Sequence, residues 1–297
     1  MHPCAEADRL RLVVGCGYLG SRVARRWSET GSRVIATTRR AARSAEVQAL
    51  GAMPAIVDVT AADPGWDRLF ADQGTPGTVL WCVGFDSRSP GTHRDVHVAG
   101  LGRLLDALAR ARARALPRVV FTSSTGVWGD DRGGVVNEAT PPSPTRDAAR
   151  ALVEAEGLLA AHQAGPGVVL RLAGLYGPDR LPRLDDLRAG RPIPADPESW
   201  LNLIHIDDAA AIVAAVADAA SPRPLYVVSD GRPVRRRDWY GRLAALTWSP
   251  EPRWDEAAPR SRGSDKRVDP SLLFQELRPT LGHPDALAAL AELIPSG

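Results

Sequence analysis

Lysine is almost absent from this sequence: Lys266 is the only one in 297 residues, and arginine supplies the rest of the positive charge. Arginine stays protonated at neutral pH, so it cannot take over the proton transfer or imine formation of a lysine amine. A P-loop, which requires Gly-Lys-Ser/Thr, is excluded. The three cysteines (Cys4, Cys16 and Cys82) are odd in number and widely spaced. This pattern indicates neither a disulfide framework nor a zinc site, so we expect no metal.

Long apolar runs and a charge excess are also missing. The richest apolar stretch, 209–220, contains Asp218 and is shorter than the roughly 20 residues of a membrane-spanning helix. Residues 1–10 show no signal-peptide pattern. Thirty-seven basic and thirty-five acidic side chains leave a charge of +2, which gives no reason to expect nucleic acid or a membrane as a partner. We expect a cytoplasmic protein with a small-molecule substrate.

Apolar runs alternate regularly with amphipathic stretches over the first 172 residues. Strands are expected at 10–14, 33–37, 55–59, 78–83, 118–122 and 168–172, and helices at 21–30, 41–50, 66–71, 95–114 and 147–162. This alternation predicts an α/β fold with a Rossmann-type, doubly wound parallel sheet.

The regular alternation of expected strands and helices ends after about residue 174, where proline and arginine become frequent. A short strand is expected at 201–206, helices at 207–220, 235–246 and 285–293, and a strand at 225–228. We therefore expect a dinucleotide-binding domain at 1–172 and a small, mainly substrate-binding region at 173–297. The 225–228 strand is expected to rejoin the first sheet.

A G-x-G-x-x-G motif follows the first expected strand and precedes a helix. Gly15 permits the tight turn, Gly17 allows the backbone to approach a pyrophosphate, and Gly20 allows close helix packing. Tyr18 and Leu19 lie where the helix begins and its N–H groups favour an anion. A glycine turn without a ligand is the alternative, but the strand–turn–helix–strand context favours a nicotinamide dinucleotide.

The end of the second expected strand bears on the choice between NAD and NADP. NAD-preferring sites usually carry an acidic residue there, which binds the ribose diol. Here the sequence has Thr38, Arg39 and Arg40, whose positive charge and hydroxyl suit a 2′-phosphate. We expect NADP in preference to NAD, with Val83 after the fourth strand as a further cofactor contact. The alternative is that the two arginines only form a solvated start of a helix.

Several further motifs occur in an order that resembles the extended short-chain dehydrogenases/reductases, which include nucleotide-sugar epimerases and dehydratases. The matching segments are Asp58-Val59, the serine stretch 122–129, the E-x-x-P loop 138–141 and the R-x-x-x-x-Y-G-P segment 171–178. The I-H-I-D-D-A segment 204–209 also resembles the family's H-V-D-D-x-A motif. The resemblance implies that Asp58 and Val59 contact adenine, that Ser124 binds a substrate oxygen, and that Tyr176 and His205 line the substrate pocket. His205 could equally be a structural residue beside a helix cap, with no contact to the substrate.

The acid/base pair of that family, Y-x-x-x-K, is missing. Aligning the expected 147–162 helix by Glu154 places Arg146 at the tyrosine position and Arg150 at the lysine position. Arg150 could still donate to the ribose, and Arg146 could stabilise an oxyanion, but neither transfers a proton. A substitute would have to come from Asp147, Tyr176, His93 or His97. The chain thus resembles an atypical subgroup of the NAD-dependent epimerases/dehydratases.

Two functional hypotheses follow. The first is an NADP-dependent oxidoreductase or epimerase that acts on a small carbonyl or sugar-like substrate through Ser124, Arg146 and Arg150. The second is a non-catalytic NADP(H)-binding sensor or regulator, which the missing pair would suit. We favour the enzyme, because the serine and the pocket segments are retained. By the same resemblance, helices 95–114 and 147–162 could form a homodimer interface.

Overall fold

A seven-stranded sheet lies at the centre of the fold in the computed structural model, which describes residues 10–88, 91–111, 116–129, 131–164, 167–255 and 265–294. Its order is β11-β7-β5-β4-β1-β2-β3. The strands are β1 (Arg11–Val14), β2 (Val34–Thr38), β3 (Met53–Ile56), β4 (Thr78–Trp81), β5 (Arg118–Ser124), β7 (Gly167–Leu172) and β11 (Leu225–Val228). β1 pairs with β2 and β4, β2 with β3, and β4 with β5, all in parallel. The predicted doubly wound parallel sheet is confirmed.

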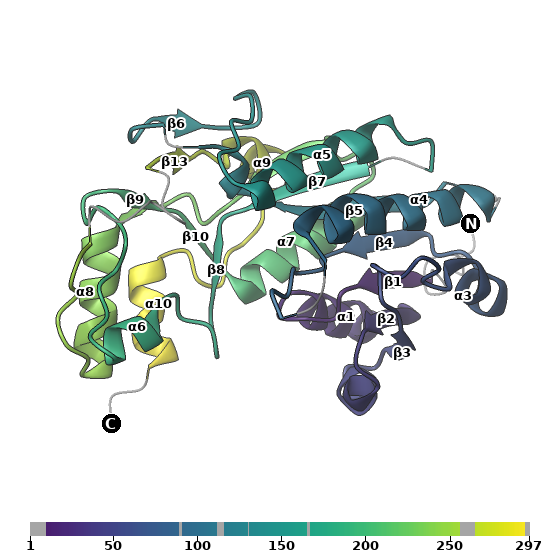
Figure 1. The fold of residues 1–297 in the computed structure, drawn as a ribbon, viewed down its shortest axis with the longest axis horizontal. Helices are drawn as coiled ribbons and strands as arrows, with labels where there is room; N and C mark the ends of the chain where they lie inside the picture. Colours follow the sequence, from purple (N-terminus) through teal and green to yellow (C-terminus); the bar gives the residue numbers. More distant parts are fainter. Residues whose placement is uncertain are drawn as a thin grey trace. The chain divides into compact units, whose positions relative to one another are not determined.

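Both faces of the sheet are covered by helices, which explains why its strands read as continuous apolar runs. Leu12 and Val14 of β1 face one core, to which α3 (Trp66–Gln73), α4 (Leu101–Arg110) and α5 (Asp147–Ala161) contribute. Val13, between them, is also fully buried and points to the other face. In Figure 1, α4 and α5 lie side by side on one face, and α1 (Gly20–Glu29) lies on the other.

The expected helices are found with shifted ends. The 41–50 helix is a 3-10 turn, η1 (Ala41–Arg43), followed by α2 (Ser44–Gln48). The 95–114 helix opens with a π-helical segment, η2 (Asp95–Gly100), which continues into α4; its last residues lie outside the described part of the chain. A π-helical segment widens the backbone turn, which the apolar spacing cannot reveal. The 55–59 strand was expected two residues too late, because the chain turns at Asp58, whose carboxylate accepts the Thr60 N–H.

The chain divides into two compact units. The first comprises residues 1–123, 146–170 and 210–225, and thus contains most of the sheet. It includes most of α7 (Ile206–Asp218), whose C-terminal end is tied to two strands. Arg118 at the start of β5 donates to the carbonyls of Ala217 and Ala219, and Arg11 of β1 pairs with Asp218 at 2.7 Å.

The second unit comprises residues 124–145, 171–209 and 226–297. Its short elements are η3 (Thr125–Val127), β6 (Val135–Val136), β8 (Gly174–Tyr176), α6 (Leu184–Arg188), β9 (Trp200–Leu201), β10 (Leu203–His205), β12 (Val234–Arg235), α8 (Arg236–Thr247), β13 (Arg267–Val268), α9 (Ser271–Leu277) and α10 (Ala286–Leu293). A separate apolar core, with Tyr176, Trp239 and Leu290 among its members, holds them together. The expected 201–206 strand is two strands, β9 and β10, separated by Asn202.

No helix within the described residues combines the length and the apolar character that crossing a membrane requires.

Candidate functional site

The glycine loop between β1 and α1 is held in place by Thr37 of β2. The Gly15 N–H donates to the Thr37 hydroxyl at 3.0 Å, and the Cys16 N–H donates to the Thr37 carbonyl at 2.9 Å. Gly15 has φ +97°, a conformation that favours glycine. A Cβ there would also lie 2.9 Å from the backbone of Cys82 and Val83. The first glycine of the motif is therefore required by both its conformation and its neighbours.

The other two glycines of the motif have opposite surroundings. A Cβ on Gly20 would meet the Gly15 carbonyl oxygen at 2.2 Å, so this glycine allows α1 to approach the loop. A Cβ on Gly17 would meet nothing within 4 Å. The Gly17 backbone thus faces open space beside the start of α1, which no side chain caps within the described part of the chain. An exposed backbone beside an uncapped helix N-terminus fits a phosphate group.

A pocket opens at this loop, within the first unit. Its lining consists of Gly15, Cys16, Gly17, Thr37, Thr38, Arg39, Arg40, Arg43, Val57, Val59, Cys82, Val83 and Gly84. Seven of the predicted cofactor residues are thus brought together, from four different segments of the chain. Tyr18, Leu19 and Gly20 lie next to the lining in sequence, at the start of α1, and Asp58 lies between two lining residues.

Three arginines give this pocket a positive rim. Arg40 is exposed, and its guanidinium makes no ion pair within the described residues. Arg39 contacts Asp86 at 3.3 Å. Arg43, which the sequence analysis missed, donates to the Cys16 carbonyl at 2.9 Å and pairs with Glu46. Arg43 follows Arg40 by three residues, and this short spacing could have predicted that it lines the same pocket.

The two cysteine thiols of the pocket, Cys16 and Cys82, are not reactive at neutral pH. Burial raises the pKa of the Cys82 thiol far above its usual range, and burial likewise raises the pKa of Cys16. Cys82 is half-buried rather than fully buried as expected, and its thiol donates to the Gly15 carbonyl at 3.1 Å. A hydrogen bond from the Thr60 hydroxyl lowers the pKa of Asp58, so this carboxylate stays charged at neutral pH.

The serine stretch and the only lysine lie in the second unit. The Ser124 hydroxyl oxygen accepts the Gly126 N–H at 3.0 Å, which leaves its proton to donate. Trp128 donates to the Thr140 carbonyl at 2.9 Å, and the guanidinium of Arg171 lies over its ring. The Lys266 ammonium is buried and donates to the Trp128 carbonyl at 3.2 Å. The lysine therefore holds the serine loop in place.

Arg146 and Arg150, the two arginines expected at the positions of the Y-x-x-x-K pair, lie at the start of α5 in the first unit. Arg150 pairs with Asp147 at 2.7 Å, and both side chains are largely exposed. Arg146 is the residue that precedes the first turn of α5. Both Arg146 and Asp147 lie close enough to His93 to act on its pKa.

His93 and His97, both in the first unit, differ in their surroundings. The His93 ring stacks on Phe85 with centroids 3.9 Å apart and remains partly exposed. Burial, together with the charge of Arg146, lowers the pKa of His93 against the opposing charge of Asp147. His97 lies in η2, and burial lowers its pKa to about 4. Both imidazoles are therefore neutral at pH 7, and His93 is the more accessible of the two.

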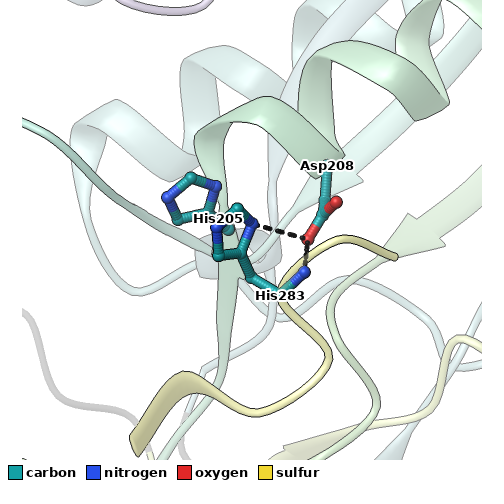
Figure 2. Close-up of side chains that lie close together, drawn as sticks. All are labelled: His205, Asp208 and His283. Atoms are coloured by element: carbon teal, nitrogen blue, oxygen red, sulfur yellow. Dashed lines mark hydrogen bonds and ion pairs between the residues drawn. The ribbon is translucent and has the colours of Figure 1, made fainter. Parts of the chain in front are cut away.

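Tyr176 and His205, the predicted substrate-pocket residues, lie together in the second unit. Their rings meet edge to face, with centroids 5.2 Å apart, and both side chains are fully buried. Burial raises the pKa of Tyr176 well above its usual range. His205 also stacks on His283, and Asp208 lies beside this pair (Figure 2). This cluster was not predicted, because His283 is distant in sequence and follows no recognisable motif.

The comparisons with known proteins agree with this geometry. Residues 11–229 match the NAD dependent epimerase/dehydratase family, and the chain belongs to this family. It is 30% identical to protein YeeZ of Escherichia coli K12 over 285 residues, which cover 93% of this chain and 96% of YeeZ.

Two solved structures extend the comparison. A functionally unknown conserved protein from Silicibacter pomeroyi is 29% identical, with a TM-score of 0.74 over 96% of this chain and 98% of that one. The UDP-glucose 4-epimerase of Thermus thermophilus, solved with NAD, has a TM-score of 0.78 at 21% identity and covers 96% and 98% of the two chains. The latter likeness shows the fold alone.

Proposed function

We propose that this protein is an NADP-dependent oxidoreductase or epimerase that acts on a small carbonyl or sugar-like substrate. The observation that carries the proposal is the pocket that both the open backbone of Gly17 and Arg40 line. The Arg40 guanidinium makes no ion pair within the part of the chain that the structure describes. The backbone suits a pyrophosphate and the arginine suits a 2′-phosphate. The family to which the chain belongs and the NAD complex of the Thermus thermophilus epimerase support the choice of a nicotinamide dinucleotide.

Different residues of the chain are proposed to hold different parts of the dinucleotide. Gly15, Gly17 and Gly20 with the start of α1 hold the pyrophosphate, Thr38, Arg39 and Arg40 hold the 2′-phosphate, and Asp58, Val59 and Val83 contact the adenosine half. Arg150 donates to the nicotinamide ribose, since this role requires only N–H groups and charge. A bound nicotinamide supplies the hydride acceptor or donor. Residues 173–297 carry most of the substrate contacts.

Proton transfer is assigned to His93. Arg146, at the position of the family's tyrosine, cannot exchange a proton at neutral pH. His93 is neutral at pH 7, lies beside Arg146 and Asp147, and is partly exposed. In alcohol oxidation the substrate O–H proton passes to the imidazole of His93 while the C–H bond gives up its hydride, and the carbonyl forms. The Ser124 hydroxyl donates a hydrogen bond to the substrate oxygen, and the charge of Arg146 stabilises the negative charge that develops on this oxygen.

Turnover tests this proposal. NADPH consumption is followed with a panel of small aldehydes and ketones. NADP reduction and sugar interconversion are followed with UDP-sugars, which are chosen because UDP-glucose is named for a structural neighbour. Ser124→Ala and His93→Gln should each lower the rate at least about a hundredfold. His162→Gln, a histidine paired with Asp106, serves as the control. Unchanged turnover in both site variants would remove the catalytic assignment.

A non-catalytic NADP(H) sensor is the second candidate. It is favoured by Arg150, whose guanidinium already pairs with Asp147. Tight NADPH binding with no hydride transfer to any member of the panel would establish this function. Stoichiometric hydride transfer to one metabolite would exclude it.

A further inference from the structure

A cluster of two histidines and one aspartate lies in the second unit, outside the cofactor pocket. His205 ends β10, Asp208 lies in the first turn of α7, and His283 lies in the segment before α10 (Figure 2). One possible ligand atom from each residue lies within 4.8 Å of the other two. The side chains of His205 and Asp208 are buried, and that of His283 is 25% exposed. The three side chains are thus already close together, and His283 is the most accessible of them.

The Asp208 carboxylate is held in place by backbone groups. It accepts the Gly282 N–H at 2.7 Å and the His283 N–H at 2.9 Å. Each carboxylate oxygen has two lone pairs, so these bonds orient the group and leave it able to bind a cation. The same two bonds fix the backbone of His283 next to Asp208.

The distance between His283 and Asp208 matches a metal site better than a direct hydrogen bond. The His283 Nδ1 lies 3.7 Å from the Asp208 Oδ2, and this buried nitrogen has no hydrogen-bond partner among the described residues. A separation of 3.7 Å is too long for a hydrogen bond. Ligand atoms around a tetrahedral Zn²⁺ with bonds of about 2.0–2.1 Å lie about 3.3 Å apart.

Each imidazole also has a second carboxylate beside its other nitrogen. Glu292 Oε2 lies 3.7 Å from His283 Nε2, and Asp207 Oδ2 lies 3.8 Å from His205 Nδ1. Histidines that bind metals usually donate their remaining N–H to a carboxylate, which fixes the tautomer and strengthens the ligand. Both carboxylates lie beyond hydrogen-bond distance in this structure, and the His205 Nδ1 accepts the Asp207 N–H at 3.3 Å. Coordination through His283 Nδ1 and His205 Nε2 therefore requires each ring to turn toward its carboxylate, with the proton on the nitrogen that faces it.

The surroundings of the cluster favour a cation. Asp230 is buried, and its Oδ2 has no hydrogen-bond partner among the described residues; the same holds for the Tyr176 hydroxyl. The negative charges of Asp208 and Asp285 both act on Asp230. Unmet oxygen ligands and crowded negative charge are conditions that a bound cation relieves.

We propose that His205, Asp208 and His283 bind one first-row divalent cation, with Zn²⁺ as the best match. Two imidazole nitrogens and one carboxylate oxygen form a donor set that Zn²⁺ uses and Mg²⁺ does not favour. The two rings are stacked, with centroids 3.6 Å apart and planes 27° apart, and an imidazole binds a metal in its own plane. Binding therefore turns the His283 ring out of the stack, and water completes the coordination.

The test uses tag-free protein treated with a chelator and then titrated calorimetrically with ZnCl₂ and, separately, MgCl₂. The wild type should bind one Zn²⁺ in the micromolar range or tighter and show no comparable Mg²⁺ binding. His283→Gln, a change at the most exposed member, should weaken Zn²⁺ binding at least tenfold. His162→Gln removes a histidine beside an acid in the first unit and should bind as the wild type does.

Co²⁺ provides a second measurement that does not depend on heats. Tetrahedral Co²⁺ absorbs visible light, so the wild type should become coloured and His283→Gln should not. Absence of Zn²⁺ binding to the wild type, or equal affinity in His283→Gln and wild type, overturns the proposal. NADPH binding is measured on the same samples; because the cofactor pocket uses none of these residues, its outcome is independent.

Discussion

A Cβ atom on Gly20 would lie 2.2 Å from the carbonyl oxygen of Gly15. The first turn of α1 therefore approaches the glycine loop more closely than any other residue type would permit. Gly17, between them, has open space where its Cβ would be. The three glycines of one motif thus separate into two that shape the loop and one that leaves room for a ligand.

This difference predicts opposite phenotypes for two alanine variants. Gly20→Ala should lower the free energy of unfolding by about 1–3 kcal/mol, because backbone must move to accommodate the methyl group. Gly17→Ala should unfold like the wild type in denaturant, yet bind NADPH at least tenfold more weakly, because the methyl group occupies the space of the pyrophosphate. A Gly20→Ala protein of wild-type stability, or full NADPH affinity in Gly17→Ala, would contradict this account.

Arg40 should decide the cofactor preference. Arg40→Ser is expected to weaken NADPH binding by about 10- to 100-fold, since a hydrogen bond to a charged group contributes about 1.5–3 kcal/mol. NADH affinity should change little, because NADH lacks the 2′-phosphate. Arg25→Ser, an exposed arginine on α1, is the matched control. Equal losses for NADPH and NADH would show that Arg40 does not bind the 2′-phosphate.

Asp230 makes stability fall as the pH rises. Burial raises the pKa of Asp230 to about 7, with further contributions from the charges of Asp285 and Asp208. In the unfolded chain this carboxyl ionises near pH 4, whereas in the folded protein it keeps its proton up to about pH 7. The free energy of unfolding therefore falls as the pH rises from about 4 to 7. Asp230→Asn should therefore be more stable than wild type at pH 8, by about 2–4 kcal/mol, and nearly equal at pH 4. Thermal unfolding in EDTA measures the difference, and Asp72→Asn, on the exposed surface, should show none.

His97 has the opposite pH dependence. Its pKa is lowered to about 4 by burial, whereas an unfolded histidine titrates near 6.5. The unfolded state therefore binds the extra proton between these values, and stability falls as the pH drops from about 6.5 to 4. His97→Gln should flatten this part of the stability curve. A wild-type curve with no slope there would show that His97 is protonated in the folded protein.

The sequence predicted the parts of the site that depend on local pattern. Gly15, Gly17 and Gly20 lie within six residues of one another, and the strand and helix around them have periodicities that a single sequence displays. Thr38, Arg39 and Arg40 were predicted because a strand end is a short-range feature. The structure places these segments around one pocket.

Contacts between distant segments could not be predicted in this way. Arg43 reaches the Cys16 carbonyl across 27 residues, and Lys266 reaches the Trp128 carbonyl across 138. His283 meets Asp208 only because a loop of the second unit returns to α7. Such contacts are set by tertiary packing, and neither periodicity nor a motif records them.

Calorimetric titration of the purified protein with NADPH, NADP, NADH and NAD tests the central claim most directly. We predict one site per chain, with the two 2′-phosphorylated nucleotides bound at least tenfold more tightly than the other two. Tighter binding of NADH or NAD would contradict the role given to the arginine rim, and no heat with any of the four would contradict the dinucleotide site itself.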